Sequence, residues 1–140
     1  LVSGNRYDAM RGWGARKNGV EIERETCPNL SDSLVAVSGL PEKDLGWDQF
    51  RNLGSAALAL CSIADGQLDA FVDCTPDAHG VWDYLGGMLI CQEAGGVVYE
   101  VKDRDLCVMN RDERRTPLAA AGRKLGEELL SIRQTFEVDN

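Results

Sequence analysis

Two long segments of the chain carry very few charged residues, and they constrain its fold more than any other feature. The first runs from Leu53 to Gly66 (LGSAALALCSIADG) and the second from Val81 to Gly96 (VWDYLGGMLICQEAGG). Their composition predicts helices, and a helix that is apolar on all sides has to be covered on all sides. We therefore expect both helices inside a layered domain rather than on its surface.

The ends of these two helices are marked by residues that start or stop helices. Ser55 is a preferred N-cap residue, and Asp65-Gly66 is expected to end the first helix. The second helix is predicted from Asp83 to Ala94, with Gly95-Gly96 directly after it. Both predictions rest on local signals, so they do not depend on the rest of the fold.

The remaining segments predict strands, turns and one further helix. Residues 1–26 show strand and turn patterns, with a tight hairpin at Asn18-Gly19, and residues 41–48 form a polar loop. Short runs rich in apolar and β-branched residues predict strands at 34–37, 68–73, 97–101 and 106–109. Apolar residues at helical spacing predict an amphipathic helix over 117–134. This mixed order of elements predicts an α/β layered domain.

Composition excludes several classes of function. The net charge of -8 argues against nucleic acid as the main partner, because a phosphate backbone requires a basic face. No apolar run reaches the roughly 18 residues of a membrane span, so no membrane partner is expected. The five cysteines are odd in number and contain no CxxC pair. They predict buried, reduced thiols in a cytoplasmic protein rather than a zinc site or a disulfide framework.

Asp83 is the most informative single residue, because it places a carboxylate at the start of an apolar helix. One interpretation is a helix cap that faces the positive end of the helix dipole. The other is a ligand for Mg²⁺, which prefers oxygen donors and is often held by one or two carboxylates together with a substrate phosphate. The residues around Asp83 leave both interpretations open.

Three segments of the chain resemble motifs of the inositol monophosphatase family, in the order that the family has them. WDYLGGMLICQEAGG resembles its C-terminal signature, RNLGSAALALCSIADGQLDAF resembles its R-x-x-G-[ST]-A-A segment with the following D-A-[YF], and GWGARKNGVEI resembles its G-x-G-A-x-x-N-G turn. Together they cover most of residues 10–101. The resemblance implies a Mg²⁺-dependent, lithium-sensitive phosphatase of inositol and sugar phosphates, commonly a homodimer. It also implies the C-terminal part of a layered αβαβα fold, with a mixed sheet packed between helices.

The same resemblance implies roles for particular residues. Asp83 corresponds to a metal ligand, and the substrate-contacting positions correspond to Gly54, Ser55 and Ala56. Asp73 corresponds to the acid that binds substrate hydroxyls. The alternatives are that residues 54–56 are small only to allow close packing, and that Asp73 is a surface acid at the end of a strand.

Several residues depart from the family pattern or stay ambiguous. Asp73 and Asp83 are farther apart than in inositol-specific members, and Asp77 between them could replace Asp73. This allows other sugar phosphates, such as fructose bisphosphate. Arg51 could pair with a carboxylate or simply lie on the surface. His79 is expected to be a solvated loop residue.

The family's other metal ligands come from a G-E-E-type segment and a D-P-[IL]-D-G-T segment, and neither occurs in this sequence. In-line attack on phosphorus needs more than the single carboxylate found here. The catalytic set is therefore incomplete in this chain, which alone is expected to be inactive. We interpret residues 1–26 as the last strands of a missing N-terminal domain and residues 27–140 as a C-terminal α/β domain. The alternative is a non-catalytic binding or assembly domain that retains the phosphatase scaffold.

Overall fold

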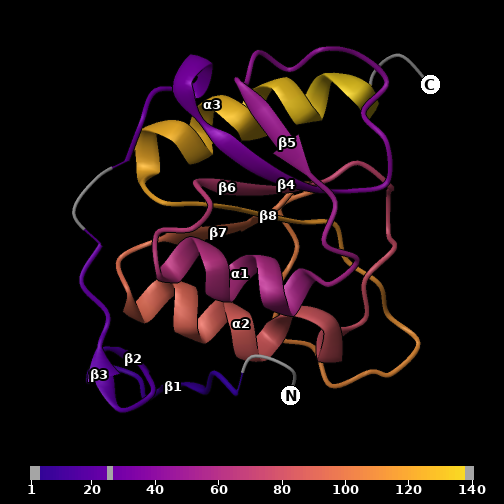
Figure 1. Ribbon diagram of the computed structural model, residues 1–140. Coiled ribbons are helices and arrows are strands. Elements are labelled where there is room, and N and C mark those ends of the chain that lie inside the picture. Colours follow the sequence, from indigo (N-terminus) through magenta and orange to yellow (C-terminus); the bar gives the residue numbers. More distant parts are fainter. Residues whose placement is uncertain (1–3, 25–26, 138–140) are drawn as a thin grey trace.

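The computed structural model describes residues 4–24 and 27–137 (Figure 1). Its centre is a five-stranded mixed sheet with the strand order β5-β4-β6-β8-β7. Two helices cover one face of this sheet and a third helix covers the other (Figure 1). The predicted mixed sheet between helices is therefore confirmed. The strands are β4 (Leu34–Ser38), β5 (Gln49–Arg51), β6 (Ala70–Asp73), β7 (Val97–Glu100) and β8 (Pro117–Ala120).

The helices are α1 (Ala56–Ala64), α2 (Val81–Glu93) and α3 (Arg123–Gln134), with short 3₁₀ turns η1 (Leu30–Asp32) and η2 (Thr135–Glu137). α1 and α2 lie together on one face of the sheet, and α3 lies alone on the other (Figure 1). None of the helices in the described part of the chain combines the length and apolarity that crossing a bilayer requires.

Strand direction determines which chain ends meet at the edge of the sheet. β4 runs parallel to both β5 and β6, and Ser38 at the end of β4 lies opposite Asp73 at the end of β6. β8 runs antiparallel between β6 and β7. The carboxyl ends of β4 and β6 therefore lie side by side, which is where open α/β sheets usually bind ligands.

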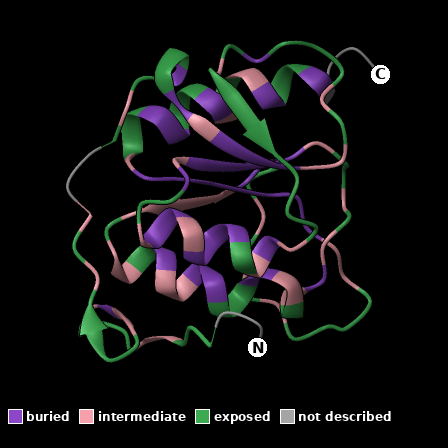
Figure 2. Ribbon diagram, viewed as in Figure 1, coloured by how far each residue is buried: buried purple, intermediate pink, exposed green. Residues whose placement is uncertain are grey.

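The sheet separates two clusters of buried side chains, as alternation along each strand requires. Both faces of the central strands are covered, so purple buried positions continue through the sheet (Figure 2). The cluster on the α3 side includes Val35, Val37, Val72, Leu118, Leu125 and Leu129. The cluster on the α1 and α2 side includes Ala36, Leu60, Ile63, Phe71, Tyr84 and Ala119.

α1 and α2 are less enclosed than their composition predicts. Their sides facing the sheet are buried, but Leu58 in α1 is 57% exposed and Trp82 in α2 is 59% exposed. Leu85 of α2 is also exposed. The prediction that both helices are covered on all sides is therefore wrong for these three side chains, although the Arg114 guanidinium lies over the Trp82 ring, 5.0 Å from its centroid.

A small antiparallel sheet docks at the C-terminal ends of α1 and α2. It consists of β1 (Tyr7–Ala9), β2 (Ala15–Lys17) and β3 (Val20–Glu21). Asp65, which follows α1, accepts hydrogen bonds from the Tyr7 hydroxyl and the Lys17 ammonium, both at 2.5 Å. Glu93 at the end of α2 accepts two backbone N–H groups of the 12–14 turn, at 2.9 and 3.0 Å. The contacts of Glu93 thus attach the glycine-rich 12–14 turn to the end of α2.

The structure confirms the predicted hairpin turn, but the predicted strand at 106–109 and the predicted start of the last helix are wrong. The hairpin at Asn18-Gly19 is confirmed, with φ angles of 54° and 81° at the two residues. Residues 106–109 form no strand, and Met109 is fully exposed. Residues 117–120 form β8 rather than the first turn of a helix, because they are buried between β6 and β7. The helix of this region starts only after Gly122.

Candidate functional site

A cavity of about 470 Å³ opens at the carboxyl ends of β4 and β6. The N-terminal ends of α1 and α2 form its other walls, so residues far apart in the sequence meet there. Four of the predicted site residues line it: Gly54, Ser55, Ala56 and Asp83. The positive ends of two helix dipoles at one cavity favour an anionic ligand.

The start of α1 supplies three of these residues, and the structure gives a different reason for the residue type at each position. Ser55 is the N-cap, and its hydroxyl accepts the Leu58 backbone N–H at 3.3 Å, as predicted from the sequence. Gly54 has a φ of +66°, and a Cβ at this position would meet nothing within 4 Å. Close packing is therefore not the reason for glycine at 54, whereas Ala56 is buried and does pack. Gly54 is required by its backbone conformation.

The capping interpretation of Asp83 is confirmed, and the metal-ligand interpretation stays a prediction. Its Oδ2 accepts the backbone N–H of Gly80 at 3.0 Å, so it does cap the first turn of α2. The helix begins at Val81, two residues before the predicted start. Among the described residues, no hydrogen bond or ion pair engages Oδ1 of Asp83. Capping therefore leaves one carboxylate oxygen that can bind a cation.

Asp73 is completely buried at the end of β6, so the alternative of a surface acid is wrong. Its Oδ2 accepts Nδ1–H of His79 at 2.6 Å, and its Oδ1 accepts the Thr75 N–H at 3.1 Å. Its backbone carbonyl accepts Nε–H of Arg133 at 2.7 Å. Asp73 is not among the residues that line the cavity, so the structure does not place its carboxylate against a ligand there.

His79 lies between Asp73 and the cavity, and the expectation of a solvated loop histidine is wrong. Its side chain is only 13% exposed, and its ring meets Phe71 edge-on, with ring centroids 6.0 Å apart. The hydrogen bond to Asp73 raises the pKa of His79, and burial opposes this rise. No periodic pattern in the sequence links the pair, because Asp73 ends a strand and His79 lies in the loop that follows.

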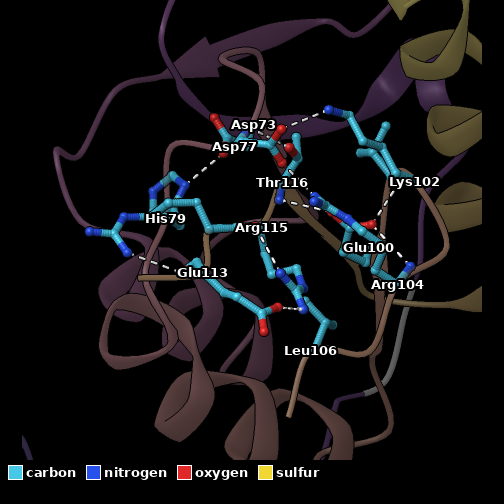
Figure 3. Close-up of polar contacts among 12 residues, drawn as sticks. Asp73, Asp77, His79, Glu100, Lys102, Arg104, Leu106, Glu113, Arg115 and Thr116 are labelled. Carbon is cyan, nitrogen blue, oxygen red and sulfur yellow. Dashed lines mark hydrogen bonds and ion pairs between the residues drawn. The ribbon is translucent and has the colours of Figure 1, made fainter. Parts of the chain in front are cut away.

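Figure 3 shows how the loop before α2 is fastened to residues 100–116. His79 and Arg115 exchange two backbone hydrogen bonds, at 3.1 and 2.8 Å. The Asp77 carboxylate binds Lys102 at 2.8 Å and Arg104 at 2.5 Å. Burial raises the pKa of Asp77, but these two hydrogen bonds outweigh burial and lower it. Asp77 lies outside the cavity lining, so its geometry does not favour it as a replacement for Asp73.

Two further observations limit the chemistry of this site. Arg51 is exposed and donates to the Phe50 carbonyl and the Gln49 side chain, which agrees with a surface arginine. Within residues 4–24 and 27–137, no group of three or more His, Cys, Asp and Glu side chains could hold a metal ion. Asp83 thus fits a cation as one oxygen ligand, and the described residues do not complete a metal site.

Comparison with known proteins identifies the family. The sequence model of the inositol monophosphatase family matches residues 2–136. A protein of Archaeoglobus fulgidus named fructose-1,6-bisphosphatase/inositol-1-monophosphatase is 33% identical over 134 residues, which are 94% of this chain and 52% of that protein. Nus factor SuhB of Escherichia coli is 32% identical over 107 residues, covering 66% of this chain and 39% of SuhB. The chain spans about half the length of this Archaeoglobus fulgidus relative and of the protein of the same name from Methanocaldococcus jannaschii.

Solved structures give the same result for the fold. A hypothetical protein of Pyrococcus horikoshii, described as having similarities to inositol-1 monophosphatase, superimposes with a TM-score of 0.80 at 24% identity. That match covers 93% of this chain and 53% of the other. The structure of SaIMPase-II with bound inositol monophosphate superimposes with a TM-score of 0.78 at 23% identity, covering 99% of this chain and 56% of the other. With the family's sequence model matching residues 2–136, the chain belongs to the inositol monophosphatase family.

Proposed function

We propose that this chain forms one part of the active site of a Mg²⁺-dependent phosphomonoesterase that acts on inositol or sugar phosphates. The observation that carries the proposal is the meeting of Asp83 with the N-terminal ends of α1 and α2 at one cavity. The names of the relatives from Archaeoglobus fulgidus and Methanocaldococcus jannaschii support the reaction class. The inositol monophosphate bound to SaIMPase-II supports the ligand class.

Each part of the cavity has a role in this proposal. Oδ1 of Asp83 holds a Mg²⁺ ion, while Oδ2 keeps the carboxylate fixed to the first turn of α2. When bound, Mg²⁺ supplies positive charge for the phosphate oxygens and activates a water molecule. Gly54, Ser55 and Ala56 place the start of α1 against the substrate, where its free backbone N–H groups suit phosphate or hydroxyl oxygens. Asp73 contributes through His79, which it holds in place.

The remaining metal ligands belong, in this proposal, to another part of the protein. Residues 1–26 are then the last strands of an N-terminal domain, and residues 27–140 are the C-terminal domain. The exposed apolar side chains of Leu58, Trp82 and Leu85 are where that N-terminal part packs. The complete protein works in the cytoplasm as a homodimer, and residues 1–140 alone do not hydrolyse the substrate.

The substitution Asp83→Asn tests the role of Asp83 in the protein that the complete gene encodes. The side-chain oxygen of asparagine can still accept the Gly80 backbone N–H, so the fold is retained while the carboxylate charge is lost. We expect Mg²⁺-dependent release of inorganic phosphate from inositol 1-phosphate and fructose 1,6-bisphosphate to fall by more than about 100-fold. Asp32→Asn, an exposed change in η1, is the matched control and should keep full activity. If Asp83→Asn retains wild-type activity and Mg²⁺ affinity, the proposal is wrong.

A binding or assembly domain without catalysis is the second candidate. It is favoured by the incomplete metal site of the described residues and by the relative named Nus factor SuhB. The two candidates differ in the coding sequence upstream of Leu1. A D-P-[IL]-D-G-T segment there favours the phosphatase, and a gene product that lacks this segment and releases no phosphate favours the binding domain.

A further inference from the structure

We propose that His79 contacts the ligand directly, with Nε2 facing an oxyanion of the bound phosphate ester and Nδ1 held by Asp73. The identity of the ligand rests on the proposed function. The contact itself rests on the geometry of the cavity. His79 is thus a binding residue, and Asp73 is a positioning residue that acts through it.

Three separate contacts fix the position of His79. Its Nδ1 is bound by the fully buried Asp73 at 2.6 Å. Its backbone N–H and C=O pair with Arg115, itself a buried residue. The edge of its ring lies against Phe71, which belongs to the core. A side chain held from its backbone, its ring and one nitrogen loses little freedom when a ligand binds, and this favours binding.

The second ring nitrogen is the one that remains for a ligand. Nδ1 is used by Asp73, and no hydrogen bond in the described part of the chain engages Nε2. His79 lines the same cavity as Ser55 and Asp83, so the exposed part of its ring borders the space that a ligand would fill.

The charge of His79 suits an oxyanion. The hydrogen bond to Asp73 raises the pKa of His79, while burial lowers it. The protonated ring donates from Nε2, and such charge-assisted hydrogen bonds to phosphate are stronger than neutral ones. The positive ends of the α1 and α2 dipoles at the same cavity also favour an anion.

NMR spectroscopy of the protein that the complete gene encodes can observe this contact directly, because the ring signals of His79 are the ones that disappear in His79→Gln. Inorganic phosphate and inositol 1-phosphate are titrated separately into ¹⁵N-labelled protein at about pH 6.5, near the ordinary pKa of histidine. We expect saturable shifts of Nε2 and of the adjacent ring proton with either ligand. Ring signals that stay unmoved, or the absence of saturable binding, would overturn the inference.

The variant His79→Gln tests how much the contact contributes. It should weaken binding of both ligands by at least about tenfold, the effect of losing a charge-assisted hydrogen bond. Arg123→Gln also removes one positive charge, but on the exposed side of α3 across the sheet, and should leave affinity unchanged. Equal affinity of His79→Gln and wild type would contradict the proposal.

Two measurements separate this inference from the proposed function. In an active enzyme, unchanged KM and kcat in His79→Gln would refute the role of His79 while the phosphatase function stands. Conversely, shifts of the His79 ring with ligand in a protein without phosphatase activity would refute only the function. Asp73→Asn should lower the pKa of His79 and move the pH dependence of ligand binding to lower pH. A pair with a purely structural role would leave that pH dependence unchanged.

Discussion

Two adjacent glycines in α2 provide a sensitive test of how closely α1 and α2 pack. A Cβ added at Gly87 would lie 2.9 Å from Cβ of Leu60 and 3.1 Å from the carbonyl oxygen of Ala57, both in α1. A Cβ added at Gly86 would meet nothing within 4 Å. Both changes to alanine improve helix propensity equally, so their difference isolates the contact between the helices.

The magnitude follows from two opposing effects. Replacing a glycine inside a helix with alanine stabilises by about 0.5–1 kcal/mol, and this is the whole effect expected for Gly86→Ala. At Gly87 the new methyl group meets a backbone oxygen that cannot rotate away, and overpacking of this kind costs about 1–3 kcal/mol. Gly87→Ala should therefore be about 1–3 kcal/mol less stable than Gly86→Ala.

Urea denaturation followed by circular dichroism measures this difference in the free energy of unfolding. For a chain of this size 1 kcal/mol corresponds to about 3–5 °C, so thermal melting should separate the two variants by about 3–15 °C. The expected order of stability is Gly86→Ala, wild type, Gly87→Ala. If the two variants have equal stability, α1 and α2 do not approach as closely as this structure places them.

Three further results are expected. Glu93→Gln can accept only one of its two backbone hydrogen bonds well, so amide hydrogen exchange in the 12–14 turn should become faster. Because the pKa of His79 is raised on folding, its contribution to stability is complete below about pH 6.5 and is lost as pH rises through the folded pKa. In His79→Gln, the free energy of unfolding should not show this decrease as the pH rises. The exposed thiols of Cys27 and Cys107 should react with a thiol reagent in the folded chain, while the buried cysteines should react only after unfolding.

The cysteine prediction illustrates what composition can and cannot establish. All five thiols are free, as the odd number and the missing CxxC pair predicted. Only Cys61 and Cys91 are buried, and burial raises the pKa of these thiols to about 11 and about 12. Cys107 was expected within a strand, and it is exposed because residues 106–109 form a loop instead.

The helices α1 and α2 were predictable because their signals are local. Ser55 caps α1 as predicted, and Gly95, directly after α2, has the left-handed backbone that commonly follows a helix. β8 was not predictable in the same way. Its residues 117–120 repeat with helical spacing into α3, and only their position between β6 and β7 makes them a strand.

The candidate site likewise contains residues that local signals predict and residues whose role depends on the tertiary fold. Asp83 and residues 54–56 stand at helix starts and within motifs that the sequence shows, so they could be named as site residues, and the fold brings them to one cavity. His79 was missed because its role depends on Asp73, six residues earlier in a different element. No helical or strand period links two such positions. A histidine a few residues after an acid that ends a central strand is the sequence signal that could have suggested the pair.

The two ends of α1 and α2 make different contacts. Substitutions at one end should therefore affect mainly the structure, and substitutions at the other end mainly ligand binding. At the C-terminal ends, Asp65 and Glu93 bind the small sheet. At the N-terminal ends, Ser55 and Asp83 line the cavity. The close approach at Gly87 joins the two helices between these ends, so their relative position is set by packing rather than by the cavity residues. The apolar helix bodies therefore hold the polar residues of the site in position, and loosening them should weaken ligand binding even when every cavity residue is intact.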